Sequence, residues 1–296
     1  KMPHVLVAGQ TGSGKSVSCL SILQLVPPPG KLVSGEILVQ GKDILKKNEN
    51  WIRNNIRGKQ ISMIFQDPSS ALNPTRTIGW QMTEALSIHS NEKIRMDDVK
   101  DKLIDALDNM DMPDPESILY KYPHQLSGGM KQRIIIAIAL LLNAKILIAD
   151  EPTTSLDVTI QLKVLDIISR LKEEFGLSVI LISHDLNVII ERCDRTVVMY
   201  GGIIVESAES RKILENPLCP YTYALIKCVP PLHKDAGSFE PIPGDVVDLL
   251  NPPIGCPFYP RCDRGDDKCK DNLPDLIEIE EGHKVRCFYP MNKVVK

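Results

Sequence analysis

The chain has 296 residues, a formal net charge of −3 and 43% hydrophobic residues, which is typical of a globular protein with one large domain or two smaller ones. The negative balance excludes a strong overall attraction to nucleic acid or anionic lipid, and an aromatic content of 5% argues against a base-stacking surface. The longest apolar run, residues 134–142, is far shorter than the ~20 residues of a membrane-spanning helix. We therefore expect any membrane role to depend on partner subunits.

The predicted elements alternate between short strands and longer helices. Short apolar or alternating runs indicate strands, and longer runs with a period near 3.6 residues indicate helices. The expected strands are residues 4–8, 34–39, 61–66, 146–149 and 179–182, with a hairpin at 197–205. The expected helices are residues 16–26, 130–143 and 160–175, the last of which ends at Gly176. This order is typical of an α/β core with a parallel sheet.

Two regions interrupt this alternation. Residues 78–133 have helical periodicity and many charges, which predicts a mainly helical insert in the α/β core. Near Asn216 the composition shifts toward Pro, Gly, Cys and charged residues. Because the remaining chain has few long periodic segments, we expect it to need a crosslink to hold its shape. We therefore predict a first domain at 1–215, with a helical subdomain at about 67–133, and a C-terminal extension at 216–296.

The loop after the first predicted strand has the spacing of a phosphate-binding P-loop. Glycines allow the backbone N–H groups to turn toward phosphates, and the following helix N-terminus adds partial positive charge. We assign Lys15 to the β- and γ-phosphates and the Ser16 hydroxyl to Mg²⁺, and a plain glycine-rich turn is the alternative. The residues that match G-x-x-x-x-G-K-[ST] or lie within it are Gly9, Gly12, Ser13, Gly14, Lys15 and Ser16.

Two carboxylates follow the predicted strand at 146–149. Asp150 and Glu151 come directly after its carboxyl end, which is where parallel sheets bind ligands. Asp150 suits the role of holding Mg²⁺ in a P-loop NTPase. A pair that only caps the following turn is the alternative. Together with the P-loop, these residues predict a site for ATP and Mg²⁺.

A second anion-binding signal lies far downstream of the P-loop. Ser127, Gly128 and Gly129 precede a predicted helix, whose first N–H groups have no partners within the helix. A Ser-Gly-Gly triplet alone is usually a helix cap, but Leu126 and Gln132 in register favour a binding motif. One ATP does not need two such sites from one chain.

With these motifs together, the chain resembles the ATP-binding cassette family, the motor subunits of ABC transporters. The resemblance implies a RecA-like P-loop NTPase core and two subunits paired head to tail, with each ATP between one P-loop and the partner's Ser-Gly-Gly. It implies that Glu151 polarises the attacking water, that Gln66 touches Mg²⁺ and water, and that His184 contacts the γ-phosphate. It also places Asp157 in the loop Ser155-Leu156-Asp157, which crosses the dimer interface.

Further stretches are similar to the motors of dipeptide and oligopeptide importers: residues 64–68, 72–74, 148–158 and 220–222. The resemblance runs from about Gly12 to Cys287. It implies that ATP-driven closure of the dimer is coupled to two transmembrane permease subunits docked around residues 67–79. An extracytoplasmic peptide-binding protein would act indirectly, and the chain would lie peripherally on the cytoplasmic face of the cell membrane. The second ATPase subunit is either a copy or a paralogue.

The extension holds four cysteines, Cys256, Cys262, Cys269 and Cys287. Four thiols in a Pro-rich segment suit tetrahedral zinc or an iron–sulfur cluster, and the close pairs typical of zinc are missing. Similar tails in some importer motors carry a [4Fe–4S] cluster, which is the expected occupant, with Zn²⁺ or uncommitted thiols as alternatives. Its expected role is structural.

Other residues of the chain give simpler expectations. Cys19 and Cys193 lie among apolar neighbours and predict buried thiols. The basic residues of the extension alternate with acids and predict a solvated face: Arg261, Arg264, Lys268 and Lys270.

The start of the chain departs from the family pattern. Members usually carry a longer segment before the P-loop, with an aromatic residue that stacks on adenine, so we expect an N-terminally incomplete sequence. Residues 1–9 are similar to the lead-in of bacterial DNA-translocase motors, Gln10 stands where an acidic residue is more common, and Cys219 where a histidine is usual. A DNA-associated ATPase is therefore the alternative function, although the net charge argues against it. A regulator that binds ATP without hydrolysing it is a third possible function, but the presence of Glu151 and His184 argues against it.

Overall fold

Short apolar strands build the sheet that carries the P-loop. The computed structural model describes residues 5–10, 12–90, 92–154, 156–186, 190, 192–228 and 241–291. In it, β1 (Val5–Ala8) pairs in parallel with both β6 (Ser178–Ser183) and β7 (Arg195–Tyr200). The loop after β1 therefore opens at the carboxyl edge of these strands, where parallel sheets bind ligands.

The chain folds into two compact units. One holds residues 3–18 and 180–296, and the other holds residues 19–179. Helix α1 (Lys15–Ile22) begins in the first unit and continues into the second. The boundaries predicted for the two domains and the helical subdomain remain predictions.

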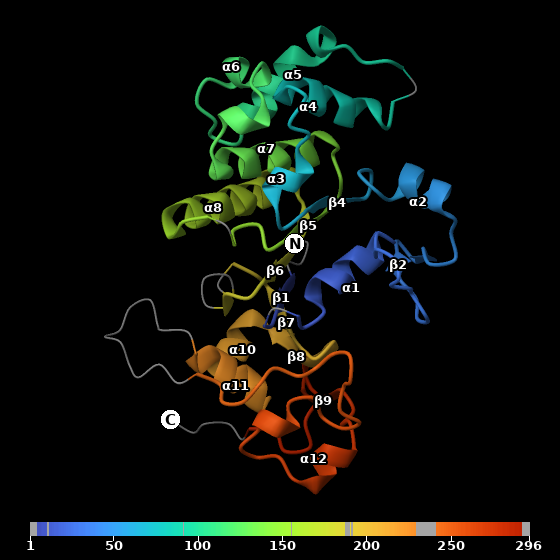
Figure 1. Cartoon of the computed structure of the whole chain (residues 1–296), viewed down its shortest axis with the longest axis vertical. Coiled ribbons are helices and arrows are strands. Elements are labelled where there is room, and N and C mark those ends of the chain that lie inside the picture. The colour runs from blue at the N-terminus through green and yellow to red at the C-terminus, as the bar shows by residue number, and fades with distance from the viewer. Residues whose placement is uncertain are drawn as a thin grey trace. The chain divides into compact units, whose positions relative to one another are not determined.

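In the first unit, the C-terminal extension adds strands to the sheet, which the sequence did not predict. β8 (Ile203–Glu209) pairs antiparallel with β7, as the predicted hairpin requires, and β10 (His283–Val285) pairs antiparallel with β8 and β9 (Ile277–Glu280). The strand order there is β6-β1-β7-β8-β10-β9 (Figure 1). The helical segments of this unit are α10 (Ser210–Glu215), α11 (Pro220–Lys227), η2 (Tyr259–Arg261) and α12 (Asp267–Asp271).

The second unit combines two parallel strands with packed helices. β4 (Ile61–Ile64) pairs in parallel with β5 (Ile146–Asp150), and α7 (Gly128–Leu141) packs against β4 and α8 (Val158–Phe175). As predicted, α8 ends at Gly176, whose φ of 61° is left-handed. The remaining elements are β2 (Leu38–Val39), β3 (Lys42–Asp43), α2 (Glu49–Asn55), α3 (Pro68–Ala71), α4 (Ile78–Ser87), α5 (Met96–Asp108), α6 (Pro115–Leu119) and η1 (Pro123–Gln125).

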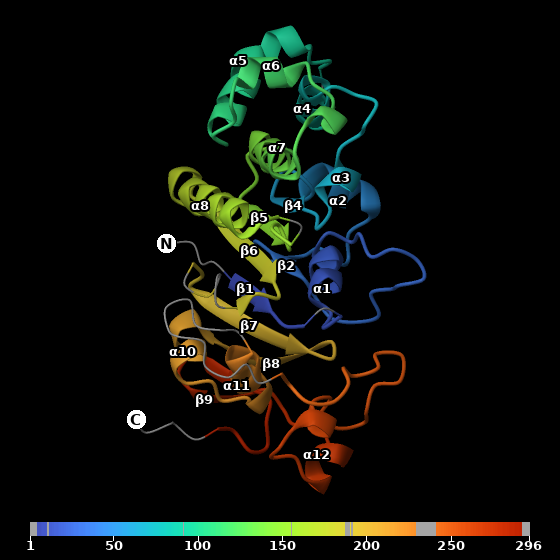
Figure 2. The same cartoon turned by 60° about the vertical axis from the view of Figure 1, so that its left-hand side comes forward.

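The helical insert is formed by α4, α5 and α6. These helices pack on one another, and α4 and α5 also pack on α7. Figures 1 and 2 show the three grouped beyond α7 at one end of this unit. The helical character predicted for residues 78–133 is thus confirmed. Among the described residues, no helix combines the length and the apolar character needed to cross a bilayer.

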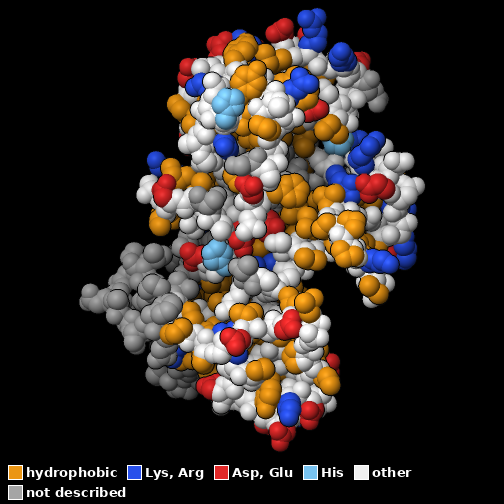
Figure 3. All heavy atoms as spheres, in the orientation of Figure 1, with side chains coloured by type: hydrophobic (Ala, Val, Ile, Leu, Met, Phe, Trp, Pro, Cys, Tyr) orange, Lys and Arg blue, Asp and Glu red, His pale blue; other side chains and the backbone are white. Residues whose placement is uncertain are grey.

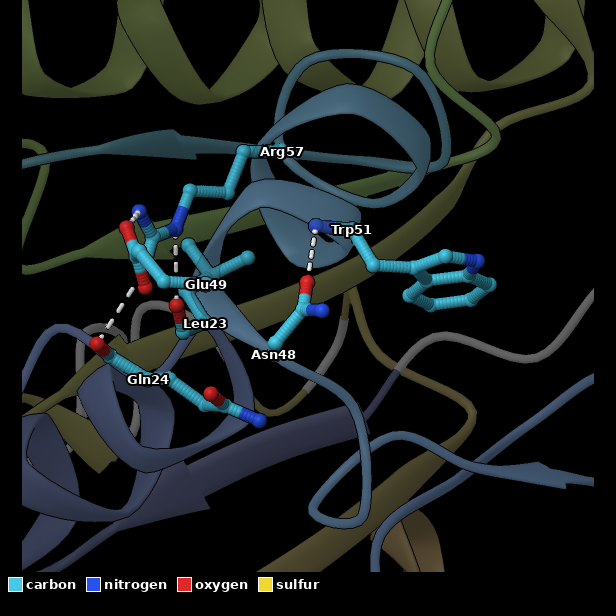
Figure 4. Close-up of polar contacts among 6 residues, drawn as sticks. All are labelled: Leu23, Gln24, Asn48, Glu49, Trp51 and Arg57. Carbon is cyan, nitrogen blue, oxygen red and sulfur yellow. Dashed lines mark hydrogen bonds and ion pairs between the residues drawn. The ribbon is translucent and has the colours of Figure 1, made fainter.

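Helix α1 is shorter than predicted. It ends at Ile22 instead of residue 26, and Gln24 adopts a left-handed φ of 52°. Arg57 Nε donates to Leu23 O at 2.8 Å and Nη2 to Gln24 O at 3.0 Å, while its guanidinium pairs with Glu49 of α2 (Figure 4). Arg57 thus satisfies two carbonyls just beyond the end of α1 and stabilises the turn in which Gln24 leaves the helix.

Two other expectations were wrong in part. The strand predicted at 34–39 forms only at Leu38–Val39, since residues 34–36 are exposed and Gly35 has a φ of 109°. Cys19 is buried as predicted, but Cys193 is only half-buried because it lines a surface cavity with Asp194 and Glu209.

Candidate functional site

The P-loop is held tightly under the end of β1. Lys15 is 3% exposed, and its Nζ donates to Gly9 O and to Ser183 O at the end of β6 (3.3 Å). Gly9 has a φ of 150°, and a Cβ at this position would lie 2.3 Å from Met199 O. Only glycine can therefore occupy this position without displacing β7.

The glycines that follow leave the backbone of the loop open. Gly12 and Gly14 have φ values of 82° and 90°, while Thr11 lies outside the described residues. The Oγ of Ser13 is buried without a hydrogen-bond partner. Gly14 then leads into α1, which begins at Lys15 with Ser16 next to it. The predicted strand, loop and helix N-terminus are thus all present.

His184 lies in the same unit as the P-loop. It directly follows β6, and its side chain is exposed. The next residue, Asp185, donates its N–H to Ser183 Oγ at 3.0 Å, which fixes the turn out of the strand. The end of β6 thus has two roles: Ser183 O accepts a hydrogen bond from Lys15, and His184 follows directly.

The acid pair ends β5 in the other unit. Asp150 and Glu151 are 5% and 6% exposed, and Glu151 has a left-handed φ of 45°. Glu151 Oε2 accepts from Gln66 Nε2 at 3.2 Å and from Thr154 Oγ1 at 2.9 Å. The structure therefore brings together two residues, Glu151 and Gln66, that the sequence placed in one site. Strained backbone of this kind is frequent at active sites.

Asp150 acts electrostatically on the P-loop helix. Burial raises the pKa of the Cys19 thiol in α1 to about 12, and the negative charge of Asp150 contributes in the same direction. The carboxylate of Asp150 thus lies within electrostatic range of Cys19, which belongs to the same unit.

The Ser-Gly-Gly triplet starts α7. Ser127 is the N-cap and its Oγ accepts from Met130 N at 3.3 Å, while Gly128 is exposed and Gly129 is buried. Ser127 therefore caps α7, and the remaining N–H groups of the first turn stay available to an anion.

Asp157 is likewise an N-cap. It caps α8 through a bond of 3.0 Å from Ile160 N to its Oδ1, and Ser155 lies outside the described residues. The predicted site residues thus fall in two groups: the P-loop and His184 in the first unit, and Gln66, Ser127, Gly128, Gly129, Asp150, Glu151 and Asp157 in the second.

Comparison with known families identifies this arrangement. Residues 2–154 match the family model described as "ABC transporter", and residues 205–269 match "Oligopeptide/dipeptide transporter, C-terminal region". The chain belongs to the ABC transporter family.

Relatives of this ABC protein extend over nearly the whole chain. It is 44% identical to the oligopeptide transport ATP-binding protein AppD of Bacillus subtilis, over 96% of this chain and 86% of that protein. It is 39% identical to the dipeptide transport ATP-binding protein DppD of Escherichia coli, over 97% of this chain and 86% of that protein. The predicted family is thus confirmed.

Solved cassettes share the fold. A dimeric, post-hydrolysis state of the cassette MJ0796 with ADP and Pi has a TM-score of 0.61 at 26% identity, covering 71% of this chain and 86% of that one. CbiO1 from Clostridium perfringens has a TM-score of 0.61 at 26% identity, covering 72% and 80%. The predicted α/β cassette fold and ATPase class are confirmed.

The four cysteines of the ABC protein's extension line one cavity, together with Cys219. Burial raises the pKa of all four thiols, that of Cys287 to about 11, and neighbouring thiols add to the shifts of Cys256, Cys262 and Cys287. The cavity volume is about 20 Å³, close to that of one water. Within the described ranges, no three His, Cys, Asp or Glu side chains are arranged to hold a metal ion, so the cluster and zinc predictions gain no support here.

Two contacts that the sequence does not predict connect the extension to the P-loop. Arg261, predicted to be solvated, instead donates from Nη1 to Gln10 Oε1 at 3.1 Å. The N–H of Gln10 donates to Tyr221 Oη at 3.0 Å. One sign of this contact was visible in the sequence. Gln10 stands where an acidic residue is more common in the family, and an acidic residue there would form an ion pair with Arg261. Cys219, the other departure, lines the cysteine cavity.

Proposed function

We propose that this ABC protein is the ATP-hydrolysing motor subunit of an importer for dipeptides or oligopeptides. The observation that carries the proposal is the buried Glu151, held by Gln66 beside Asp150 at the end of β5. The match of residues 205–269 to the oligopeptide/dipeptide region and the names of the relatives support the substrate class. In this assignment, residues 1–215 are the nucleotide-binding domain, with a helical subdomain at about 67–133, and 216–296 are the extension.

Each site residue has a defined role in the proposed reaction. Lys15 binds the β- and γ-phosphates, and Ser16 and Asp150 hold Mg²⁺, with Gln66 in contact with it. Glu151 orients the attacking water, because its Oε2 is fixed by two donors and its carboxylate is buried. His184, exposed after β6, contacts the γ-phosphate. Phosphoryl transfer needs positioning and charge stabilisation more than covalent chemistry.

The second ATPase subunit completes each site. The first turn of α7 begins at the exposed Ser127 and Gly128 and continues with the buried Gly129, and its unpaired N–H groups suit the γ-phosphate of an ATP bound to a partner's P-loop. Asp157 then lies at the same interface. Binding of ATP closes the pair, and hydrolysis removes the bridging phosphate and opens it. The partner is a second copy or a paralogue.

The helical subdomain transmits this motion to two permease subunits. Residues 67–79 follow Gln66 directly, and their neighbour Trp80 is 39% exposed with the guanidinium of Arg76 4.6 Å from its ring centroid. An exposed aromatic residue at the end of the segment that follows Gln66 suits a protein contact. The chain would thus lie peripherally on the cytoplasmic face of the membrane, with a peptide-binding protein on the other side.

The extension is proposed to hold a [4Fe–4S] cluster through Cys256, Cys262, Cys269 and Cys287. The donor set suits a Cys₄ group, since all four thiols face one cavity, and Zn²⁺ remains the alternative occupant. The cavity of about 20 Å³ is too small for a cluster, so the four thiols would have to move apart and lose their protons to hold one. Cys256, Cys262, Cys269 and Cys287 would hold the cluster, which would supply a structural crosslink between residues 256–269 and 287.

No nucleic-acid partner is part of the proposal. On the face drawn in Figure 3, Lys and Arg side chains are interspersed with acidic and hydrophobic ones, and the net charge is −3. Counterion release from DNA requires a concentrated row of cations. Stimulation of ATP hydrolysis by DNA would instead favour the alternative, a DNA-associated ATPase.

Deletion of the gene from its host tests the proposed function. Uptake of radiolabelled dipeptides or oligopeptides should be lost and should return with a plasmid copy. Light scattering of the purified protein should show an ATP-dependent dimer, alone or with its paralogue. Unchanged uptake of both peptide classes would contradict the importer role, and a strictly monomeric, fully active ATPase would contradict the shared site.

A further inference from the structure

Arg261 joins the C-terminal extension to the P-loop. Its Nε and Nη2 donate to the backbone carbonyls of Pro243 (2.8 Å) and Ile242 (2.9 Å). Its Nη1 lies 3.1 Å from Gln10 Oε1 and 3.3 Å from Tyr200 Oη. Because a guanidinium is planar, the two bonds to the extension fix the direction in which Nη1 reaches Gln10.

Gln10 is held by its backbone as well as by its side chain. Its N–H donates to Tyr221 Oη at 3.0 Å, and its carbonyl accepts from Ser13 N at 3.1 Å. Tyr221 is fully buried, with its ring centroid 5.2 Å from that of Phe258 in the extension. The turn that starts the P-loop thus depends on groups from α11 and from residues 258–261.

A second contact reaches the other end of the loop. A Cβ on Gly201 would lie 2.8 Å from Pro257 Cβ, so the turn between β7 and β8 packs directly on the extension. Gly202 N donates to Ser13 O at 3.1 Å, and a Cβ on Gly14 would lie 3.3 Å from Gly202 Cα. Residues 257–261, between Cys256 and Cys262 of the cavity, therefore support both ends of the P-loop.

We propose that Arg261 is a positioning residue for ATP binding, through which the C-terminal extension sets the affinity of the P-loop. A P-loop binds phosphate with backbone N–H groups that must already point inward, so groups that fix its first turn determine its affinity. Arg261 does not touch phosphate; it acts through Gln10. The proposal rests on the ATP-binding role proposed above.

Isothermal titration with MgATP tests this proposal. Arg261→Ala should raise the Kd about tenfold, the effect of losing one hydrogen bond to a charged group. Lys270→Ala is the matched control, because it removes one exposed positive charge from the same extension without touching the loop. In ATPase assays, KM should rise for Arg261→Ala while kcat stays within about twofold, since positioning affects binding here.

A double-mutant cycle separates positioning from general stability. In a Gln10→Ala background, Arg261→Ala should change the Kd by less than about twofold, because the contact is already lost. If Arg261→Ala fails to fold by circular dichroism, Gln10→Ala alone should still weaken MgATP binding several-fold. The inference would be overturned, and the proposed function left standing, by either of two results. One is an equal Kd for Arg261→Ala and Lys270→Ala; the other is an equal Kd for Gln10→Ala and the unsubstituted protein. An unsubstituted protein that does not bind MgATP would overturn the proposed function.

Discussion

His283 Nε2 lies 2.8 Å from Glu206 Oε1, and both side chains are fully buried. The same carboxylate accepts from Leu218 N at 2.7 Å and from Cys219 N at 3.0 Å. One side chain of β8 thus joins β10 of the extension to the start of α11. Since buried polar groups require partners, this cluster defines how the extension attaches to the sheet.

Replacing Glu206 with Ala should destabilise the first unit. The substitution leaves the N–H groups of Leu218 and Cys219 and the ring of His283 buried without their acceptor. We expect a loss of roughly 3 kcal/mol in the free energy of unfolding, measured by urea titration. Glu209→Gln, on the exposed end of the same strand, should change stability by less than about 0.5 kcal/mol. Similar losses for both variants would show that the cluster contributes little.

Two adjacent glycines at the start of α7 should respond differently to alanine. A Cβ on Gly129 would lie 2.8 Å from Ile160 Cγ2 of α8, whereas a Cβ on Gly128 has its nearest neighbour at 3.8 Å. Gly129→Ala should therefore cost about 1–3 kcal/mol of stability through overpacking, and Gly128→Ala should be close to neutral. Thermal unfolding of the two variants checks this, and equal melting temperatures would contradict the close packing of α7 on α8.

The contribution of Cys19 to stability should depend on pH. Its pKa is raised to about 12 by burial and then by Asp150, so the folded protein holds this proton more tightly than the unfolded chain does. The stabilisation is complete below about pH 9 and is lost as the pH rises toward 12, with a slope of at most ~1.4 kcal/mol per pH unit. Cys19→Ala should therefore destabilise the protein at pH 8 and cost about 1 kcal/mol less at pH 10. A cost independent of pH would contradict the raised pKa.

The motifs were predictable because each depends on local spacing. The P-loop, the acid pair after β5 and the capped start of α7 all follow from residues within a few positions of one another. The roles of Gln66 and Glu151 toward the attacking water came from the family resemblance and stay predictions, whereas the hydrogen bond between the two side chains is known only from the structure. Residue patterns within a segment do not give contacts such as Arg57 to the end of α1, or Arg261 to Gln10, because their partners are distant in sequence.

The early end of α1 and the strands of the extension were missed for the same reason. β9 alternates strictly over its four residues, but it pairs only with β10, whose three residues are too few for a pattern. β10 in turn forms because β8 offers an edge. Arg261 illustrates the limit most directly. Its neighbours alternate in charge as on a solvated surface, and only the fold places Gln10 and two backbone carbonyls around it.

Iron content should distinguish the proposed occupants of the cysteine cavity. Protein purified without oxygen should contain iron and acid-labile sulfide and absorb near roughly 400 nm, as Cys-ligated clusters do. Cys287→Ala should abolish both, whereas Cys228→Ala, at the end of α11 and outside the residues that line the cavity, should not. Stoichiometric zinc without iron would favour the alternative site, and absence of both metals would leave the thiols uncommitted.

Glu151→Gln should separate ATP binding from ATP hydrolysis. The amide keeps an acceptor for Gln66 Nε2 and Thr154 Oγ1 but loses the negative charge that polarises the attacking water. We expect turnover to fall at least ~100-fold, the usual contribution of a general base, while MgATP binding and ATP-dependent pairing persist. Glu174→Gln, exposed at the end of α8, is the matched control and should hydrolyse ATP normally. Since ATP is not consumed, Glu151→Gln should accumulate as a stable dimer in size-exclusion chromatography with MgATP; turnover equal to that of the control would remove Glu151 from the reaction.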